Sequence, residues 1–199
     1  FLGASEALSA REIDQAALFY SEWFYVEGYL VTDEARTLAT KIAVETAKAN
    51  NIKVAISLSD PFVVAFFGDA LLEVIGGGVD LIFCNKDEVM AFTGTESLEA
   101  AAESLKQHTK TFAITDGANG AITFDGNTMN QSKGVEAKAI DTNGAGDMFA
   151  GAFLYAITSG KSYAWAADLA NDCAARVVAQ FGPRLEASEF DVIKAQFGI

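Results

Sequence analysis

The sequence has very few of the residue types that usually anchor disulfide, zinc or histidine chemistry. It contains only two cysteines, two prolines and one histidine in 199 residues. Two cysteines, Cys84 and Cys173, are too few for a disulfide framework, so we expect buried, reduced thiols. The lone His108 lies in a polar stretch, which argues against a Ser-His-Asp triad or a histidine-rich zinc site. A scarcity of proline with 51% apolar residues is typical of a well-packed α/β protein.

Long apolar runs and net positive charge are also missing. The FVVAFF run of residues 62–67 is far shorter than the roughly 20 residues of a membrane span. The first residues lack the basic and apolar regions of a signal peptide, so we expect a cytoplasmic protein. Residue 1 is Phe and not Met, so we expect these residues to begin inside a longer chain. A net charge of −13 disfavours binding to nucleic acid or anionic membranes. A small anion held by local amides and a metal ion stays compatible with that charge.

Apolar segments that read as strands alternate with amphipathic helical segments. We expect strands at 23–31, 52–59, 79–84 and 135–140, and a hairpin from 110–117 and 120–126. Helices are expected from an N-cap at Thr32 to residue 50, and over 61–75, 86–94, 97–108, 145–159, 162–181 and 186–197. The aromatics Trp23, Phe24, Trp165 and those of residues 62–67 fit core positions better than a base-stacking surface. The pattern predicts a three-layer α/β fold, a mostly parallel sheet flanked by helices on both faces, with ligands beyond the carboxyl ends of its strands.

The stretch DTNGAGD, residues 141–147, combines small residues with two carboxylates at the start of an expected helix. Gly144, Ala145 and Gly146 let a ligand approach the backbone, and free N–H groups at a helix N-terminus suit a phosphate. The simpler interpretation is that Asp147 only stabilises the helix end. A dinucleotide fingerprint would need glycine at Phe149, and the GKS of 160–162 ends a helix instead of following a strand.

The segment DTNGAGDMFAGAFL, residues 141–154, resembles the C-terminal signature of the ribokinase, or PfkB, family of sugar and nucleoside kinases. VDLIFCNKDEV is similar to the family's strand with N-x-x-E, ITDGANGAITF to its T-x-G-x-x-G hairpin, and LANDCAARVVAQFG to its late helix near the adenine. YVEGYL and SLSDPF lean toward the adenosine kinase branch. The resemblance implies a ribokinase-like fold in which residues 1–199 form the C-terminal major part, carrying the ATP site. The first strands and a small β lid would precede it.

The resemblance also implies roles for individual residues. Asp147 would be the base that accepts the proton of the acceptor hydroxyl, while the backbone at Asn143, Gly144, Ala145 and Gly146 would stabilise the transferring phosphoryl group. Thr115, Gly117, Gly120 and Asn171 would lie on the nucleotide side. A plain tight turn explains Thr115, Gly117 and Gly120 equally well, and an exposed or locally bonded helix residue is the alternative for Asn171.

The resemblance further implies metal sites. Asn85 and Glu88 would help to place Mg²⁺ and its waters, and the alternative is a reciprocal helix cap formed by the same two residues. Asp141, with Thr142, would form part of the monovalent-cation site of some relatives, which makes K⁺ a candidate. A structural Asp is the alternative there.

The implied activity is ATP- and Mg²⁺-dependent transfer of the γ-phosphoryl group to a hydroxyl, with adenosine as the first expected acceptor. A sugar, inosine or guanosine comes next. The exact DTNGAGD sequence disfavours a family relative that acts on a vitamin hydroxymethyl group. A nucleotide-binding module without catalysis is the non-enzymatic alternative. The expected partner is a small-molecule nucleoside or sugar, and the expected state is a monomer or homodimer.

Overall fold

The computed structural model describes residues 7–199, which fall into two compact units divided between Ile114 and Thr115. Within the described residues the strands form a six-stranded sheet whose order is the chain order, β1 to β6. The strands are β1 (Trp23–Glu27), β2 (Lys53–Ser57), β3 (Val79–Asn85), β4 (Thr109–Thr115), β5 (Ala121–Phe124) and β6 (Met129–Ser132).

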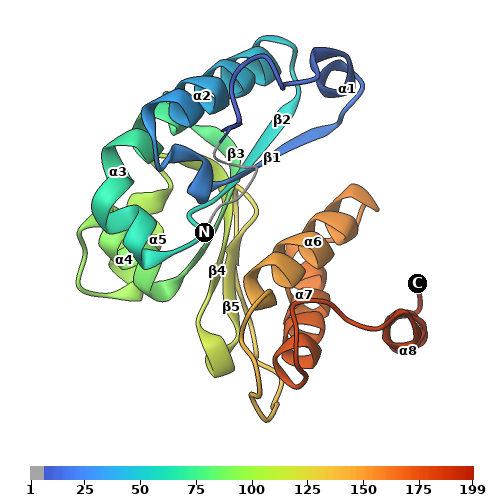
Figure 1. Ribbon diagram of the computed structural model, residues 1–199. Helices are drawn as coiled ribbons and strands as arrows, with labels where there is room; N and C mark the ends of the chain where they lie inside the picture. Colours follow the sequence, from blue (N-terminus) through green and yellow to red (C-terminus); the bar gives the residue numbers. More distant parts are fainter. Residues whose placement is uncertain (1–6) are drawn as a thin grey trace. The chain divides into compact units, whose positions relative to one another are not determined.

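The first unit is built from parallel strands joined by helices. β1 pairs in parallel with β2, and β2 with β3, so that Val26, Ile56 and Ile82 lie in register and are almost fully buried. Four helices of this unit each contact the next one along the chain (Figure 1): α2 (Glu34–Ala49), α3 (Pro61–Ile75), α4 (Lys86–Thr93) and α5 (Leu98–Leu105). A short helix, α1 (Gln15–Phe19), precedes β1. The parallel sheet that the near-continuous apolar strands predicted is therefore confirmed.

The second unit combines a hairpin with three helices. β5 and β6 are antiparallel, and α7 (Tyr163–Val178) contacts both strands as well as α6 (Ala145–Thr158). The last helix is α8 (Ala187–Phe197). Phe153 of α6 and Ala166, Ala170 and Val177 of α7 are fully buried, so the two helices share an apolar seam.

The strand expected over residues 23–31 is wrong in its second half. β1 ends at Glu27, and Gly28–Val31 forms a 3-10 helix, η2. A side chain at Gly28 would meet the Leu58 carbonyl oxygen at 2.6 Å. The chain therefore turns here with its backbone in close contact with the loop that follows β2. The Gly28 N–H donates to Ser59 Oγ at 2.8 Å, which fixes the turn.

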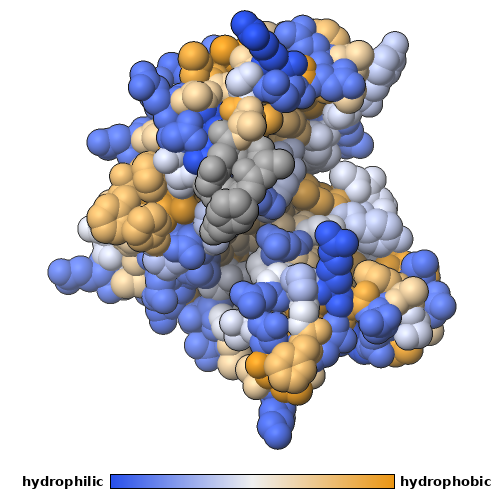
Figure 2. Space-filling model, viewed as in Figure 1, coloured by the Kyte–Doolittle hydropathy of each residue, from blue (hydrophilic) through white to orange (hydrophobic). Residues whose placement is uncertain are grey.

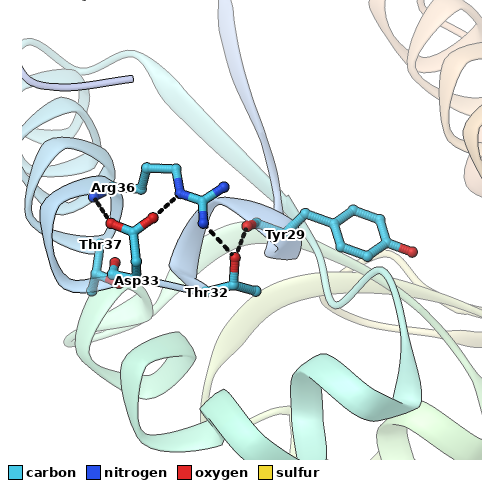
Figure 3. A network of polar contacts seen from close by, with 5 residues as sticks. All are labelled: Tyr29, Thr32, Asp33, Arg36 and Thr37. Atoms are coloured by element: carbon cyan, nitrogen blue, oxygen red, sulfur yellow. Dashed lines mark hydrogen bonds and ion pairs between the residues drawn. The ribbon is translucent and has the colours of Figure 1, made fainter. Parts of the chain in front are cut away.

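The N-cap expected at Thr32 is also displaced by one residue. Asp33 caps α2 by accepting from the Arg36 N–H at 3.0 Å, and its other oxygen accepts from Arg36 Nε. Arg36 Nη2 donates to Thr32 Oγ1 at 2.9 Å, and that hydroxyl donates to the Tyr29 carbonyl (Figure 3). The buried Arg36 side chain thus ties η2 to the start of α2.

The strand expected at 135–140 is wrong, because this segment does not join the sheet. Residues 133–139 have no regular structure, and the antiparallel partner of β5 is β6, which precedes them and was not predicted. Val135 and Ile140 are 42% and 49% exposed, so this segment has no buried face to hold it as a strand.

Burial confirms the cysteine prediction but contradicts the prediction for two aromatics. Cys84 and Cys173 are free and buried, and burial raises the pKa of the Cys173 thiol to about 11. Phe62 and Phe66 are 58% and 70% exposed, on the helix face opposite to the buried Val63 and Val64. Their rings contact each other in a tilted arrangement with centroids 4.5 Å apart. Figure 2 shows an apolar patch where Figure 1 places α3. In the part of the chain that the structure describes, no helix is both long and apolar enough to cross a bilayer.

Candidate active site

Residues Asp141–Asp147, called the anion loop below, make a tight turn that leads into α6. Gly144 is the N-cap of this helix with φ = 79°, a left-handed conformation suited to glycine. The Ala145 N–H donates to the Thr142 carbonyl at 3.3 Å. No side chain caps the helix, so the N–H groups of Gly146 and Asp147 have no partner among the described residues. Space is open beside Gly146, and an anion can approach these donors.

Asp147 lies in the first turn of α6 and is exposed. It has no hydrogen bond or ion pair to any described residue, unlike most capping carboxylates of this protein. Its carboxylate is therefore available to a ligand at the same helix end. The simpler interpretation is that Asp147 places a favourable negative charge at the positive end of the helix dipole. It also holds for this position and does not exclude ligand binding.

Asp141 uses both carboxylate oxygens on backbone amides. Oδ1 accepts from the Asn143 N–H at 3.0 Å, and Oδ2 accepts from the Gly182 N–H at 3.1 Å. These hydrogen bonds lower the pKa of the Asp141 carboxyl, the Asn143 bond most, so it is ionised at neutral pH. The Asn143 amide is thereby engaged inside the anion loop, which leaves the later amides of the loop as the open donors.

Asn85 and Glu88, in the first unit, form the reciprocal cap at the start of α4. Asn85 Oδ1 accepts from the Glu88 N–H at 2.8 Å, and Glu88 Oε2 accepts from the Asn85 N–H at 2.9 Å. Asn85 Nδ2 also donates to Glu88 Oε1 at 2.6 Å. The capping interpretation is confirmed, while a role in placing a metal ion stays a prediction.

The chemistry around Glu88 nevertheless fits a cation. Its side chain is buried, and desolvation, with the nearby negative charges of Asp60 and Asp87, raises its pKa to about 7, although the Asn85 N–H partly opposes this. A buried carboxylate among like charges is stabilised in its ionised form by a cation. Carboxylate and amide oxygens are also the ligand types that Mg²⁺ prefers.

Two of the residues predicted on the nucleotide side, Gly120 and Asn171, contact the same backbone segment of the second unit. A side chain at Gly120, which has φ = 96°, would overlap the Ser132 carbonyl oxygen and meet Gly134 N. Asn171 Nδ2 donates to Ser132 Oγ at 2.8 Å and to the Lys133 carbonyl at 3.2 Å. Gly120 and Asn171 therefore both fix the chain at 132–134. This agrees with the tight-turn alternative for Gly120, whereas Asn171 is buried and bonds to residues far away in sequence, so it is neither exposed nor locally bonded.

Thr115 and Gly117 lie at the other end of the same turn. Thr115 is the last residue of β4, and Gly117, with φ = 53°, begins the 3-10 helix η3 (Gly117–Asn119). Gly117 is exposed and has open space beside it, so a ligand can approach the backbone here. Neither residue is placed against a ligand, and their nucleotide role stays a prediction.

Sequence reasoning missed one part of the site, the segment that packs behind the anion loop. A side chain at Gly144 would lie 2.5 Å from Pro183 Cβ and 2.6 Å from the Pro183 carbonyl oxygen. Together with the Asp141–Gly182 bond, this contact joins residues about forty positions apart. Gly182-Pro183 reads in sequence as an ordinary turn, so no local signal identifies it.

Comparison with known proteins assigns the chain to a family of phosphotransferases. The model of the pfkB family of carbohydrate kinases matches residues 1–189. Adenosine kinase of Schizophyllum commune is 27% identical over 191 residues, which is 86% of this chain and 55% of that protein. The crystal structure of adenosine kinase from Sinorhizobium meliloti superposes with a TM-score of 0.89 at 31% identity, over 95% of this chain and 58% of that one. The crystal structure of a probable sugar kinase from Rhizobium etli superposes with a TM-score of 0.90 at 28% identity, over 96% of this chain and 58% of that one.

The chain therefore belongs to the pfkB family of carbohydrate kinases. The predicted family and the three-layer, ribokinase-like α/β fold with a mostly parallel sheet are both confirmed. The chain spans about half the length of the curated relatives it matches, between 44% and 60% of the adenosine kinases compared.

Proposed function

We propose that the complete protein is a cytoplasmic kinase that uses ATP and Mg²⁺ to phosphorylate a hydroxyl group of a nucleoside, with adenosine as the first candidate. Membership in the pfkB family supports the reaction class, and the similarity to adenosine kinases supports the acceptor. One observation carries the assignment to a site. The free amides at the start of α6 and the unpaired carboxylate of Asp147 lie at the same helix end.

In the proposed reaction, the acceptor hydroxyl attacks the γ-phosphorus of ATP. Its proton moves to the Asp147 carboxylate as the new O–P bond forms, and the bond to the β-phosphate oxygen breaks to release ADP. The Gly146 and Asp147 amides would stabilise negative charge on the transferring group. Mg²⁺, held through Asn85, Glu88 and waters, would neutralise phosphate charge when bound. A monovalent cation such as K⁺ beside Asp141 stays a further prediction.

The acceptor is the least constrained part of the proposal. The similarity to a probable sugar kinase keeps a simple sugar as the second candidate. A nucleotide-binding module without catalysis is the third candidate. A nucleoside is preferred because adenosine kinases recur among both the curated relatives and the solved structures.

The test measures ATP consumption by the complete protein against a panel of nucleosides and sugars. Turnover with adenosine supports the proposal, turnover only with a sugar selects the second candidate, and ATP binding without turnover selects the module. Asp147→Asn should reduce turnover by about 10²–10⁴-fold while ATP still binds. Asp69→Asn, the same change at an exposed position of α3, is the matched control and should keep full activity. An Asp147→Asn enzyme with normal turnover would remove the assigned base.

A further inference from the structure

The segment between α7 and α8, residues 179–186 and called the connector below, lies directly behind the anion loop. We propose that the connector positions the anion loop for phosphoryl transfer, with Pro183 as the positioning residue that sets the place of Gly144. The catalytic consequence rests on the proposed function, whereas the mechanical coupling between the two segments does not.

The first observation is a backbone contact. The position that a side chain would take at Gly144 lies 2.5 Å from Pro183 Cβ, 2.6 Å from its carbonyl oxygen and 2.7 Å from its Cα. These distances are shorter than van der Waals contact, so the two backbones touch and no side chain fits between them. Gly144 is the N-cap of α6, and the orientation of an N-cap determines where the next amides point. Moving Pro183 would therefore move the donors at Gly146 and Asp147.

The second observation is a carboxylate that bridges the same two segments. Asp141 accepts from Asn143 inside the anion loop and from Gly182 inside the connector, at 3.0 and 3.1 Å. The Ile140 N–H also donates to the Val178 carbonyl at 2.7 Å, just before the connector begins. The loop is therefore fixed to the end of α7 and to the connector at three successive points.

The third observation is that the connector is itself restrained. The Pro183 ring fixes φ of that residue, and Gln180 Nε2 donates to the Arg184 carbonyl at 2.5 Å across the turn. A restrained segment transmits its position to what it touches, whereas a loose one would follow the loop. The structure thus gives the connector the role of support and the anion loop the role of the supported element.

Three variants of the complete protein separate this role from a general effect on folding. Pro183→Gly removes Cβ and frees the backbone, so it removes both the contact and the restraint. Pro183→Ala keeps Cα, Cβ and the carbonyl oxygen, the three atoms that face Gly144, and loses only the ring. Phe181→Ala changes a connector side chain that is 85% exposed, and it controls for substitution in this segment.

The primary measurement is hydrogen exchange of the amides at residues 142–147. Pro183→Gly should raise their exchange rate by about tenfold or more, while Pro183→Ala stays closer to the parent and Phe181→Ala matches it. The melting temperature and the exchange of α7 report overall stability and should change little. Unchanged exchange in Pro183→Gly, or an equal rise across all of the second unit, would overturn the inference.

The second measurement links the coupling to catalysis. Pro183→Gly should reduce kcat by about 10²-fold with KM for ATP within about twofold, because misplaced donors lower transition-state stabilisation more than binding. Asp141→Asn loses one of the two hydrogen bonds from backbone N–H groups. Its effect on kcat should be non-additive with that of Pro183→Gly, because both act through the connector. Additive effects would contradict a shared mechanism. A parent protein without turnover would refute the proposed function alone, because the exchange measurement still tests the coupling.

Discussion

Glu88 is the residue whose environment departs most from that of an ordinary surface carboxylate. Its pKa is raised to about 7 by burial and by the charges of Asp60 and Asp87, while an unfolded chain titrates near the ordinary value of 4.5. The folded state therefore binds a proton more tightly than the unfolded state between these two values. It follows that the free energy of unfolding falls as pH rises from about 5 to about 7, and then levels.

Glu88→Gln should remove this pH dependence. The glutamine side chain has no charge to desolvate. The fall in the free energy of unfolding between pH 5 and pH 8, on the order of 2–3 kcal/mol in total, should therefore largely disappear. The loss of one hydrogen bond to Asn85 would lower stability equally at every pH. Urea unfolding at several pH values, in EDTA to keep cations away, measures the slope. Glu96→Gln, at an exposed position, is the control and should keep the parent slope. A parent protein whose stability is constant over this range would contradict the raised pKa.

Gly120 is the second residue with a specific expected effect. Its φ of 96° strains any other residue, and an added Cβ would overlap the Ser132 carbonyl oxygen. Gly120→Ala should therefore reduce the free energy of unfolding by about 2 kcal/mol or more, through strain and separation of the β5 turn from β6. Gly151→Ala on α6, where nothing lies within 4 Å of the added carbon, should be neutral or stabilising. Equal unfolding midpoints for the two variants would show that the turn relaxes at no cost.

At the scale of elements, the Arg176 side chain links α7 to α8. Arg176 donates to Asp172 at 2.7 Å on its own helix, and to Glu189 and Gln196 of α8 at 2.8 Å each. The carboxylates of Asp172 and Glu189 raise the pKa of Arg176, so its charge is retained at any working pH.

Arg176→Ala should loosen α8 and leave α7 in place. Three hydrogen bonds are lost and Asp172 keeps only its bond to Gln196, so we expect the local opening free energy of α8 to fall by about 1–2 kcal/mol. Hydrogen exchange of residues 187–197 measures this, and Lys194→Ala, at an exposed position of α8, is the control. If exchange in α8 stays at the parent rate, the remaining Gln196–Asp172 bond and the packing of Trp165 on Phe197 are enough to hold the helix.

The helices and strands also differ in how well the sequence predicts them. Apolar periodicity located α3, α5, α6 and α7 and the cores of β2 and β3, because each buries several apolar residues. It also located α4, α8 and β1, in which only Val89, Ile193 and Val26 are buried apolar residues. It failed at Gly28–Val31, where a close backbone approach and the buried Arg36 turn the chain into a 3-10 helix. It also failed at residues 135–140, whose alternating pattern has no partner to bury it. Both failures depend on contacts with residues distant in sequence.

The candidate site divides in the same way. The anion loop and the Asn85–Glu88 pair were predictable because their residues are contiguous and their geometry is set by helix ends. The connector was not predictable, because Gly182 and Pro183 meet Asp141 and Gly144 only after the chain has passed through α6 and α7. A sequence motif therefore identifies the donors of this site, and the fold is needed to identify their support.

At the scale of the whole molecule, the dominant property is the charge of −13, from 27 acidic and 14 basic residues. Such an excess repels itself more strongly in the compact state than in the expanded unfolded chain, and dissolved salt screens that repulsion. We therefore expect the urea midpoint at pH 7.5 to rise when NaCl is increased from about 20 to about 300 mM, over which the Debye length falls severalfold.

The same titration separates screening from specific ion binding. Screening depends on ionic strength alone, so NaCl and KCl should raise the midpoint equally and without saturation at low millimolar concentration. A cation bound beside Asp141 would instead add a saturable increment for one ion, because a ligand that binds only the folded state stabilises it by RT ln(1 + [L]/Kd). Asp141→Asn should abolish such an increment and keep the screening response. A midpoint that falls with either salt would show that the local ion pairs outweigh the repulsion of the net charge.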